Sequence, residues 1–179
     1  MSEFYTMKIA GLERSLRKFP VNDKLDIAAF ILFGDTEITV ASATELLKRV
    51  PEFDVILTPE AKSIPLAYEM SRQSGKPYIV ARKGVKVYMG DPLCVSVRSI
   101  TTNKLQELYL GDSDVEFIKG KKVLIVDDVI STGESLIAVR KLVSEAGGIE
   151  AASCAVLAEG DAAQRDDIVF LEPLPLFFK

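Results

Sequence analysis

The chain has 179 residues, enough for one α/β domain with a buried core, and we expect residues 1–179 to form a single domain. The 26 acidic residues outnumber the 22 basic ones and no basic block stands out, which argues against nucleic acid as the main partner. The sequence has no histidine, so Ser–His and Cys–His nucleophiles and histidine acid–base catalysis are excluded.

The first forty residues have mixed patterns, and only their end suggests regular structure. Residues 37–40 are compatible with a short strand. Ser42 stands three positions before Glu45, a capping box that predicts the start of a helix ending at Pro51.

From residue 55 onward, strands and helices alternate. Two helices are predicted, one with Pro65 in its first turn and Gly75 after its end, the other ending at residues 147–148. Short apolar runs predict strands at residues 55–58, 78–81, 123–126, 154–157 and 168–170. Continuous apolar strands alternating with amphipathic helices indicate an α/β fold, with a central, mostly parallel sheet flanked by helices.

Residues 84–112 interrupt this alternation. Val95 and Val97 precede residues 101–104, and Leu105 and Leu108 follow them, which predicts an antiparallel ribbon inserted into the α/β frame. Insertions of this length often serve as lids over active sites.

The most informative segment is residues 123–136. An apolar strand leads to two adjacent carboxylates, Asp127 and Asp128, and a hydroxyl-rich turn then enters a helix. Backbone N–H groups at such a helix N-terminus bind phosphate, and the two carboxylates can accept hydrogen bonds from vicinal sugar hydroxyls. The predicted phosphate contacts are Ser131, Thr132, Gly133, Glu134 and Ser135. Phosphate on one side and a diol on the other describe a ribose 5-phosphate.

The simpler alternative is that the acidic residues only cap the next helix. The apolar strand before Asp127 and the Ser-Thr-Gly turn after Asp128 favour the phosphate site instead. Other phosphate motifs are missing, because the sequence has neither a Gly-x-x-x-x-Gly-Lys-Ser/Thr loop nor a Gly-x-Gly-x-x-Gly turn after a strand.

This segment resembles the phosphoribosyl pyrophosphate signature of type I phosphoribosyltransferases, with Glu134 where many members have glycine. The resemblance implies that Asp127 and Asp128 act at the ribose in the reaction centre. It also implies a pyrophosphate site formed by Ala61, Lys62, Ser63, Arg82 and Lys83, and a lid formed by the ribbon. The implied fold adds a small hood made from the terminal segments.

The implied reaction transfers ribose 5-phosphate from phosphoribosyl pyrophosphate to a purine base and releases pyrophosphate. We expect no metal centre built by the protein itself, but Mg²⁺ held mainly by the substrate. The base would lie against Val129 and Ile130 beneath the hood, for which residues 10–16 and 171–177 are candidates. The family also implies a homodimer.

Two departures from the family bear on the base. Hypoxanthine-guanine enzymes have an Asp at the position of Ser131, so the sequence favours the adenine-like group. Adenine enzymes usually carry a Glu-Tyr pair in the lid, however, where this chain has residues 99–102. The altered lid keeps open a non-catalytic alternative, a regulatory protein that senses phosphoribosyl pyrophosphate.

The remaining patterns concern location. No apolar run approaches the ~20 residues needed to span a bilayer, and the start lacks the layout of a signal peptide. Cys94 and Cys154 lie in apolar surroundings and are predicted to be buried free thiols. We therefore expect a cytoplasmic protein that contacts no membrane.

Overall fold

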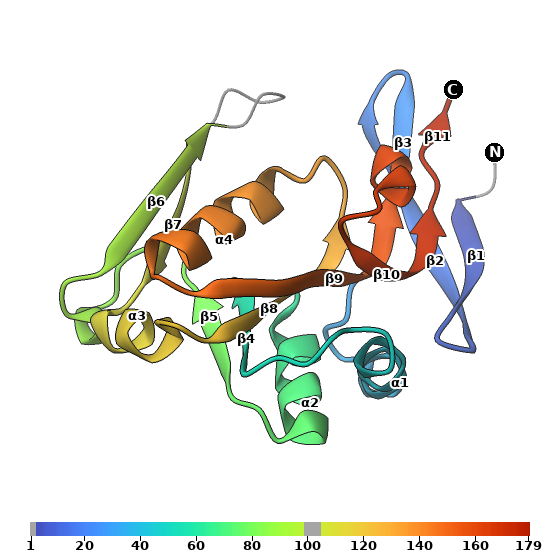
Figure 1. Ribbon diagram of the computed structural model, residues 1–179. Coiled ribbons are helices and arrows are strands. Elements are labelled where there is room, and N and C mark those ends of the chain that lie inside the picture. Colours follow the sequence, from blue (N-terminus) through green and yellow to red (C-terminus); the bar gives the residue numbers. More distant parts are fainter. Residues whose placement is uncertain (1–2, 99–104) are drawn as a thin grey trace.

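A five-stranded parallel sheet forms the centre of the protein (Figure 1). The structure is a computed structural model and describes residues 3–98 and 105–179. The strand order is β10-β9-β8-β4-β5, made of β10 (Val169–Leu174), β9 (Ile149–Glu159), β8 (Lys122–Ile130), β4 (Val55–Pro59) and β5 (Tyr78–Ala81). All four neighbouring pairs are parallel, which confirms the predicted α/β fold.

Both faces of this sheet are covered, which explains the continuous apolar runs in its strands (Figure 1). Helix α4 (Glu134–Glu145) and the ribbon of β6 (Leu93–Arg98) and β7 (Leu105–Leu110) cover one face, where Leu57 and Ile125 are buried. Helices α1 (Thr36–Leu47) and α2 (Ile64–Ser74) cover the other, where Leu124 is buried. Burying one such side chain contributes about 1.5–3 kcal/mol.

The hood is a four-stranded antiparallel sheet built from both ends of the chain. Its order is β1-β2-β3-β11, made of β1 (Phe4–Ile9), β2 (Leu12–Asn22), β3 (Leu25–Ala28) and β11 (Phe177–Phe178). Figure 1 shows these strands together at one end of the molecule. Ile9 and Leu16 are buried in the same apolar cluster as Leu124, so the hood and the central sheet share one core.

The predicted helix before Pro51 is present, but the predicted strand at residues 37–40 and the predicted helix start at Ser42 are wrong. A single helix, α1, begins at Thr36 and takes in the whole segment predicted as a strand. Its N-cap is Asp35, which accepts a hydrogen bond from the Ile38 N–H at 3.1 Å, while Ser42 is buried in mid-helix. Arg14 of β2 donates two hydrogen bonds to Asp35, from Nε at 2.7 Å and Nη2 at 3.0 Å. This long-range contact fixes the cap and could not be read from local sequence.

The other predicted elements are confirmed, with changes at their ends. Helix α2 has Pro65 in its first turn and ends at Gly75, whose φ is 69°. The ribbon pairs Val95 with Leu108, whereas its predicted turn at residues 101–104 lies outside the described residues. Strand β8 continues to Ile130, so the two aspartates lie inside the strand. Three short helices were not predicted: η1 (Val87–Met89), α3 (Asp112–Ile118) and η2 (Gly160–Gln164).

One cysteine prediction is also wrong. Cys154 is buried in the sheet, as expected, but Cys94 is exposed, because it lies on the outer face of the edge ribbon. Within the described ranges, no helix is long and apolar enough to span a membrane.

Candidate active site

Asp127 and Asp128 lie in the carboxyl-terminal part of β8, the region of a parallel sheet where ligands bind. The Asp128 N–H donates a hydrogen bond to Asp127 Oδ1 at 2.9 Å. Asp128 is buried, and its Oδ2 lies 2.9 Å from Lys62 Nζ. In the described part of the chain, that oxygen has no partner with hydrogen-bond geometry, so it can still accept a hydrogen bond from a ligand.

The surroundings of Asp127 raise the pKa of its carboxyl group. Burial, and next the negative charge of Asp128, raise the pKa of Asp127 to about 8. The site therefore favours the protonated form of Asp127. A cation or a hydrogen-bond donor placed between the two groups would favour the ionised form.

The turn after β8 is the segment predicted to bind phosphate, and we call the cavity beside it the phosphate cradle. A small cavity of about 40 Å³ is lined by Asp127 and by residues 129–136. Gly133 has φ 82°, a conformation that favours glycine, and α4 begins at the next residue. The N–H groups at the start of a twelve-residue helix meet the hydroxyls of the turn here, an arrangement that suits an anion.

The predicted pyrophosphate loop lies between β4 and α2. A cavity of about 280 Å³ contains Ala61, Lys62, Ser63 and Lys83 together with both aspartates. Ser63 is buried and its Oγ lies 2.7 Å from Thr58 Oγ1, which is also 2.8 Å from the Val126 carbonyl oxygen. These buried hydroxyls tie the loop to β8. The peptide bond between Glu60 and Ala61 is cis.

Arg82 was predicted to contact pyrophosphate, but it does not line this cavity. Its guanidinium lies 3.3 Å from Glu60 Oε1, and Glu60 Oε2 accepts a hydrogen bond from the Lys83 N–H at 3.0 Å. Arg82 thus contacts the loop through Glu60. Gln106 of the ribbon was not predicted, yet it lines the cavity and donates to Ser135 Oγ at 3.3 Å.

A third cavity, of about 340 Å³, lies beneath the hood. Val129 lines it as predicted, whereas Ile130 is buried and lines the phosphate cradle instead. Two segments were candidates for the hood over this cavity, residues 10–16 and 171–177. Leu174 of the second segment lines the cavity, and none of residues 10–16 does. The lining also includes residues 27–31, Lys62, Ser131 and Glu159.

The three cavities adjoin, because Val129 lines all of them. Lys62 is shared by the loop cavity and the hood cavity, and Ser131 by the phosphate cradle and the hood cavity. Glu159 could have been found from the sequence, since it follows a predicted strand at the edge of the sheet where ligands bind.

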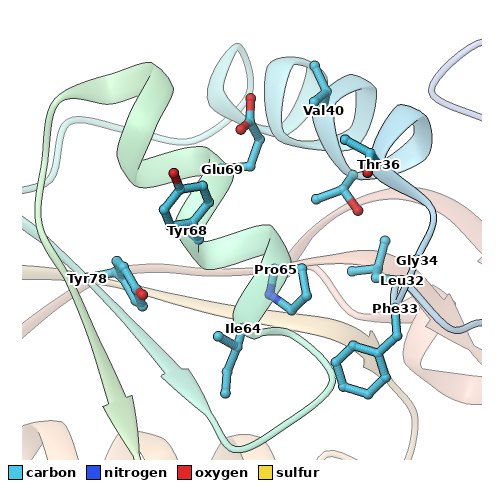
Figure 2. Close-up of a pocket in the computed structure, with 11 residues that line it drawn as sticks. Leu32, Phe33, Gly34, Thr36, Val40, Ile64, Pro65, Tyr68, Glu69 and Tyr78 are labelled. Carbon is cyan, nitrogen blue, oxygen red and sulfur yellow. The ribbon is translucent and has the colours of Figure 1, made fainter.

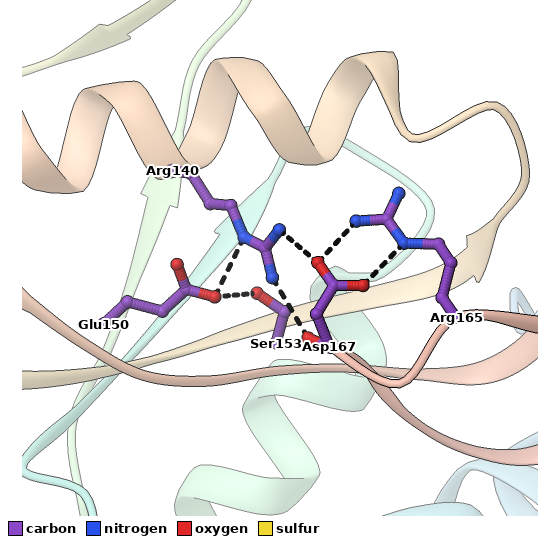
Figure 3. Close-up of polar contacts among 5 residues, drawn as sticks. All are labelled: Arg140, Glu150, Ser153, Arg165 and Asp167. Carbon is purple, nitrogen blue, oxygen red and sulfur yellow. Dashed lines mark hydrogen bonds and ion pairs between the residues drawn. The ribbon is translucent and has the colours of Figure 1, made fainter.

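A chain of hydrogen-bonded charged side chains lies beside α4 (Figure 3). Arg140 of α4 donates to Glu150 Oε1 at 2.9 Å and to Asp167 Oδ2 at 2.6 Å. Asp167 in turn accepts from Arg165, through Nε at 2.8 Å and Nη2 at 2.7 Å. A Cβ placed on Gly133 would lie 2.5 Å from Arg165 Nη1, so the guanidinium packs directly on the glycine.

A further hollow of about 440 Å³ lies between α1 and α2 (Figure 2). Phe33, Val40 and Tyr68 give it a mainly apolar lining. Its one carboxylate, Glu69, accepts hydrogen bonds from Arg72 and Gln73. None of the predicted site residues lines this hollow, so we place the active site at the three adjoining cavities.

Known proteins share this fold. Residues 36–174 match the phosphoribosyl transferase domain, and the chain belongs to that family. It is 37% identical over 124 residues to a hypoxanthine/guanine phosphoribosyltransferase of Methanococcus voltae, an alignment covering 69% of this chain and 63% of that protein. The protein of the same name from Methanotorris igneus is 32% identical over 145 residues, covering 76% of this chain and 75% of the relative.

The fold is similar to that of solved adenine phosphoribosyltransferases. The structure from Thermoanaerobacter pseudethanolicus superposes with a TM-score of 0.74 at 22% identity, over 88% of this chain and 95% of that one. At this identity the comparison supports the fold and leaves the choice of base open.

Proposed function

We propose that the protein transfers ribose 5-phosphate from phosphoribosyl pyrophosphate to a purine base and releases pyrophosphate. The observation that carries the proposal is the set of three adjoining cavities that share Val129. Each offers the chemistry that one part of the reaction needs: a helix N-terminus for the 5-phosphate, lysines for pyrophosphate and a hood cavity for the base. The names of the relatives support the same reaction class.

The proposed roles follow from the positions of the side chains. The turn of Ser131, Thr132, Gly133, Glu134 and Ser135 holds the 5-phosphate. Asp127 and Asp128 accept hydrogen bonds from the ribose hydroxyls and fix the sugar between the cavities. Lys62 and Lys83 face the leaving pyrophosphate, where negative charge develops as the glycosidic bond breaks. The protein then acts by orienting the reactants and stabilising charge.

The site fits Mg²⁺ that arrives with the substrate. In the described ranges, no cluster of three or more His, Cys, Asp or Glu side chains could hold a metal. Asp127 and Asp128 offer carboxylate oxygens beside the lysine-lined cavity, and Mg²⁺ is commonly bound by one or two carboxylates plus substrate oxygens and water. When bound, Mg²⁺ would neutralise charge on the pyrophosphate.

Several expectations stay predictions: a single domain over residues 1–179, a homodimer, a cytoplasmic location and the adenine-like choice of base. The last rests on Ser131, while the names of the relatives point to hypoxanthine and guanine. The proposed reaction is therefore stated for a purine base, without a choice between adenine and the 6-oxopurines.

The test is to incubate the protein with Mg²⁺, phosphoribosyl pyrophosphate and adenine, guanine, hypoxanthine or xanthine in turn, and to measure nucleotide and pyrophosphate. We expect a nucleotide from at least one base. Binding of phosphoribosyl pyrophosphate without nucleotide from any base would refute the enzyme and leave the sensing protein.

A further inference from the structure

The hood cavity combines an apolar slot with three polar side chains. Its apolar lining includes Ile27, Val129 and Leu174, which suit the faces of a flat ring. The polar side chains are Lys62, Ser131 and Glu159. In such a site a few placed polar groups decide which ring is accepted.

Glu159 is the acceptor in this cavity. It is the last residue of β9, where its neighbour Ala158 pairs with Ile130. Burial raises the pKa of Glu159, and the positive charge of Lys62 opposes that shift. Its carboxylate is half-buried and makes no hydrogen bond or ion pair within residues 3–98 and 105–179. A ligand that donates to it would stabilise its charged form.

Lys62 is the donor in the same cavity. Its ammonium group lies 2.9 Å from Asp128 Oδ2, and its side chain is 53% exposed. An ammonium group has three N–H donors, so one contact with Asp128 leaves two for ligands. The cavity therefore presents a positive donor and a negative acceptor to whatever lies between the hood and Val129.

This pairing distinguishes purines by their Watson–Crick edges. Guanine and hypoxanthine carry an acceptor at O6 beside a donor at N1–H, and guanine adds a donor, its 2-amino group. Adenine reverses the order, with a donor at N6 and an acceptor at N1, whose lone pair would face a carboxylate. Xanthine keeps O6 and N1–H but carries a second oxygen at C2, which would repel the same carboxylate.

We propose that the hood cavity selects 6-oxopurines without an oxygen at C2, guanine and hypoxanthine, because Glu159 accepts from N1–H while Lys62 donates to O6. The 2-amino group of guanine gives Glu159 a second donor. This inference rests on the proposed function and names the acceptor class of that site. If this inference holds, a serine at position 131 is no sign of adenine specificity, because the carboxylate that contacts the base is Glu159 at the end of β9.

The test compares the wild-type protein with Glu159→Gln. The substitution keeps the size of the side chain but turns one acceptor oxygen into a donor, which suits N1 of adenine. For each protein, kcat/KM is measured with guanine, hypoxanthine, xanthine and adenine, and the KM for phosphoribosyl pyrophosphate is measured with the best base. The matched control is Asp161→Asn, an exposed carboxylate two residues further on that does not line the cavity.

We expect wild-type kcat/KM to be highest for guanine and hypoxanthine. In Glu159→Gln the guanine-to-adenine ratio should fall about 10- to 100-fold, as for loss of a hydrogen bond to a charged group. The KM for phosphoribosyl pyrophosphate should stay within about twofold, which also shows that the variant folds, and Asp161→Asn should match wild type. A wild-type preference for adenine or xanthine, or an unchanged ratio in Glu159→Gln, would overturn the inference.

A binding measurement separates failure of this inference from failure of the proposed function. Calorimetry with GMP, IMP, XMP and AMP needs no catalysis. If no base yields nucleotide, the proposed reaction falls, yet tighter binding of GMP and IMP that is lost in Glu159→Gln would still support base selection. Equal affinity for GMP and AMP in the wild-type protein would overturn it.

Discussion

Replacing Gly133 by alanine tests whether the turn after β8 must keep its shape to hold phosphate. Gly133 has φ 82°, and a non-glycine residue in the left-handed region costs about 1–2 kcal/mol. The new Cβ would also lie 2.5 Å from Arg165 Nη1, so the guanidinium must move. Its two hydrogen bonds to Asp167 hold it in place, but that pair is partly exposed, so weakening it costs at most about 1 kcal/mol.

Together the two effects lower the free energy of unfolding by about 1–3 kcal/mol, or roughly 2–12 °C in Tm for a chain of this size. Urea unfolding measures the first quantity, and calorimetric titration with phosphoribosyl pyrophosphate measures the effect on the turn. We expect binding to weaken at least about tenfold, because the N–H groups at the start of α4 no longer converge.

The matched control is Gly120→Ala. Gly120 has a similar φ, 73°, but a Cβ there would meet nothing within 4 Å, so only backbone strain is added. Gly133→Ala should be the less stable variant, and adding Arg165→Ala to it should recover part of the difference. Equal stability of the two glycine variants would remove the role given to Arg165. Undiminished phosphoribosyl pyrophosphate binding by Gly133→Ala would show that the phosphate lies elsewhere.

Three further predictions concern charged residues of the site. The double variant Asp127→Asn/Asp128→Asn should lose phosphoribosyl pyrophosphate binding while keeping the wild-type circular dichroism spectrum; undiminished affinity would contradict the site. Because the pKa of Asp127 is raised to about 8, its neutral form favours folding below about pH 4, and that contribution is lost as pH rises through about 8. Asp127→Asn should therefore gain stability over wild type between pH 5 and pH 9 in urea unfolding, and a constant difference would contradict the raised pKa. Lys62→Ala should weaken pyrophosphate binding about tenfold or more in calorimetry, whereas Lys48→Ala, at the C-cap of α1 and outside the cavities, should not.

The sequence predicted the centre of the fold because its strands are apolar on both faces. Strand β8 shows this directly, since Val123, Leu124, Ile125 and Val126 are all buried, and such a short continuous apolar run is typical of a strand inside a parallel sheet. The two aspartates and the hydroxyl-rich turn follow this run directly, and the structure places them around adjoining cavities.

The hood could not be predicted in the same way. In β1 exposed and half-buried residues alternate, and only Ile9 is fully buried, so the apolar signal is weak. Pairing of β11 with β3 joins Phe177 to Asp26, near opposite ends of the chain. Glu159 follows a predicted strand, but the cavity that it lines also needs residues 27–31, which reach it only once the hood has formed.

The position of Lys62 links the occupancy of the two halves of the site. One ammonium group faces the cavity proposed for pyrophosphate and the cavity proposed for the base. A bound pyrophosphate that attracts the Lys62 ammonium group would change the electrostatic field at the base. A bound base that attracts the ammonium group would change the field at the pyrophosphate. Thermodynamic reciprocity requires the two effects to be equal, so the proposed site would couple donor and acceptor affinities through a single side chain.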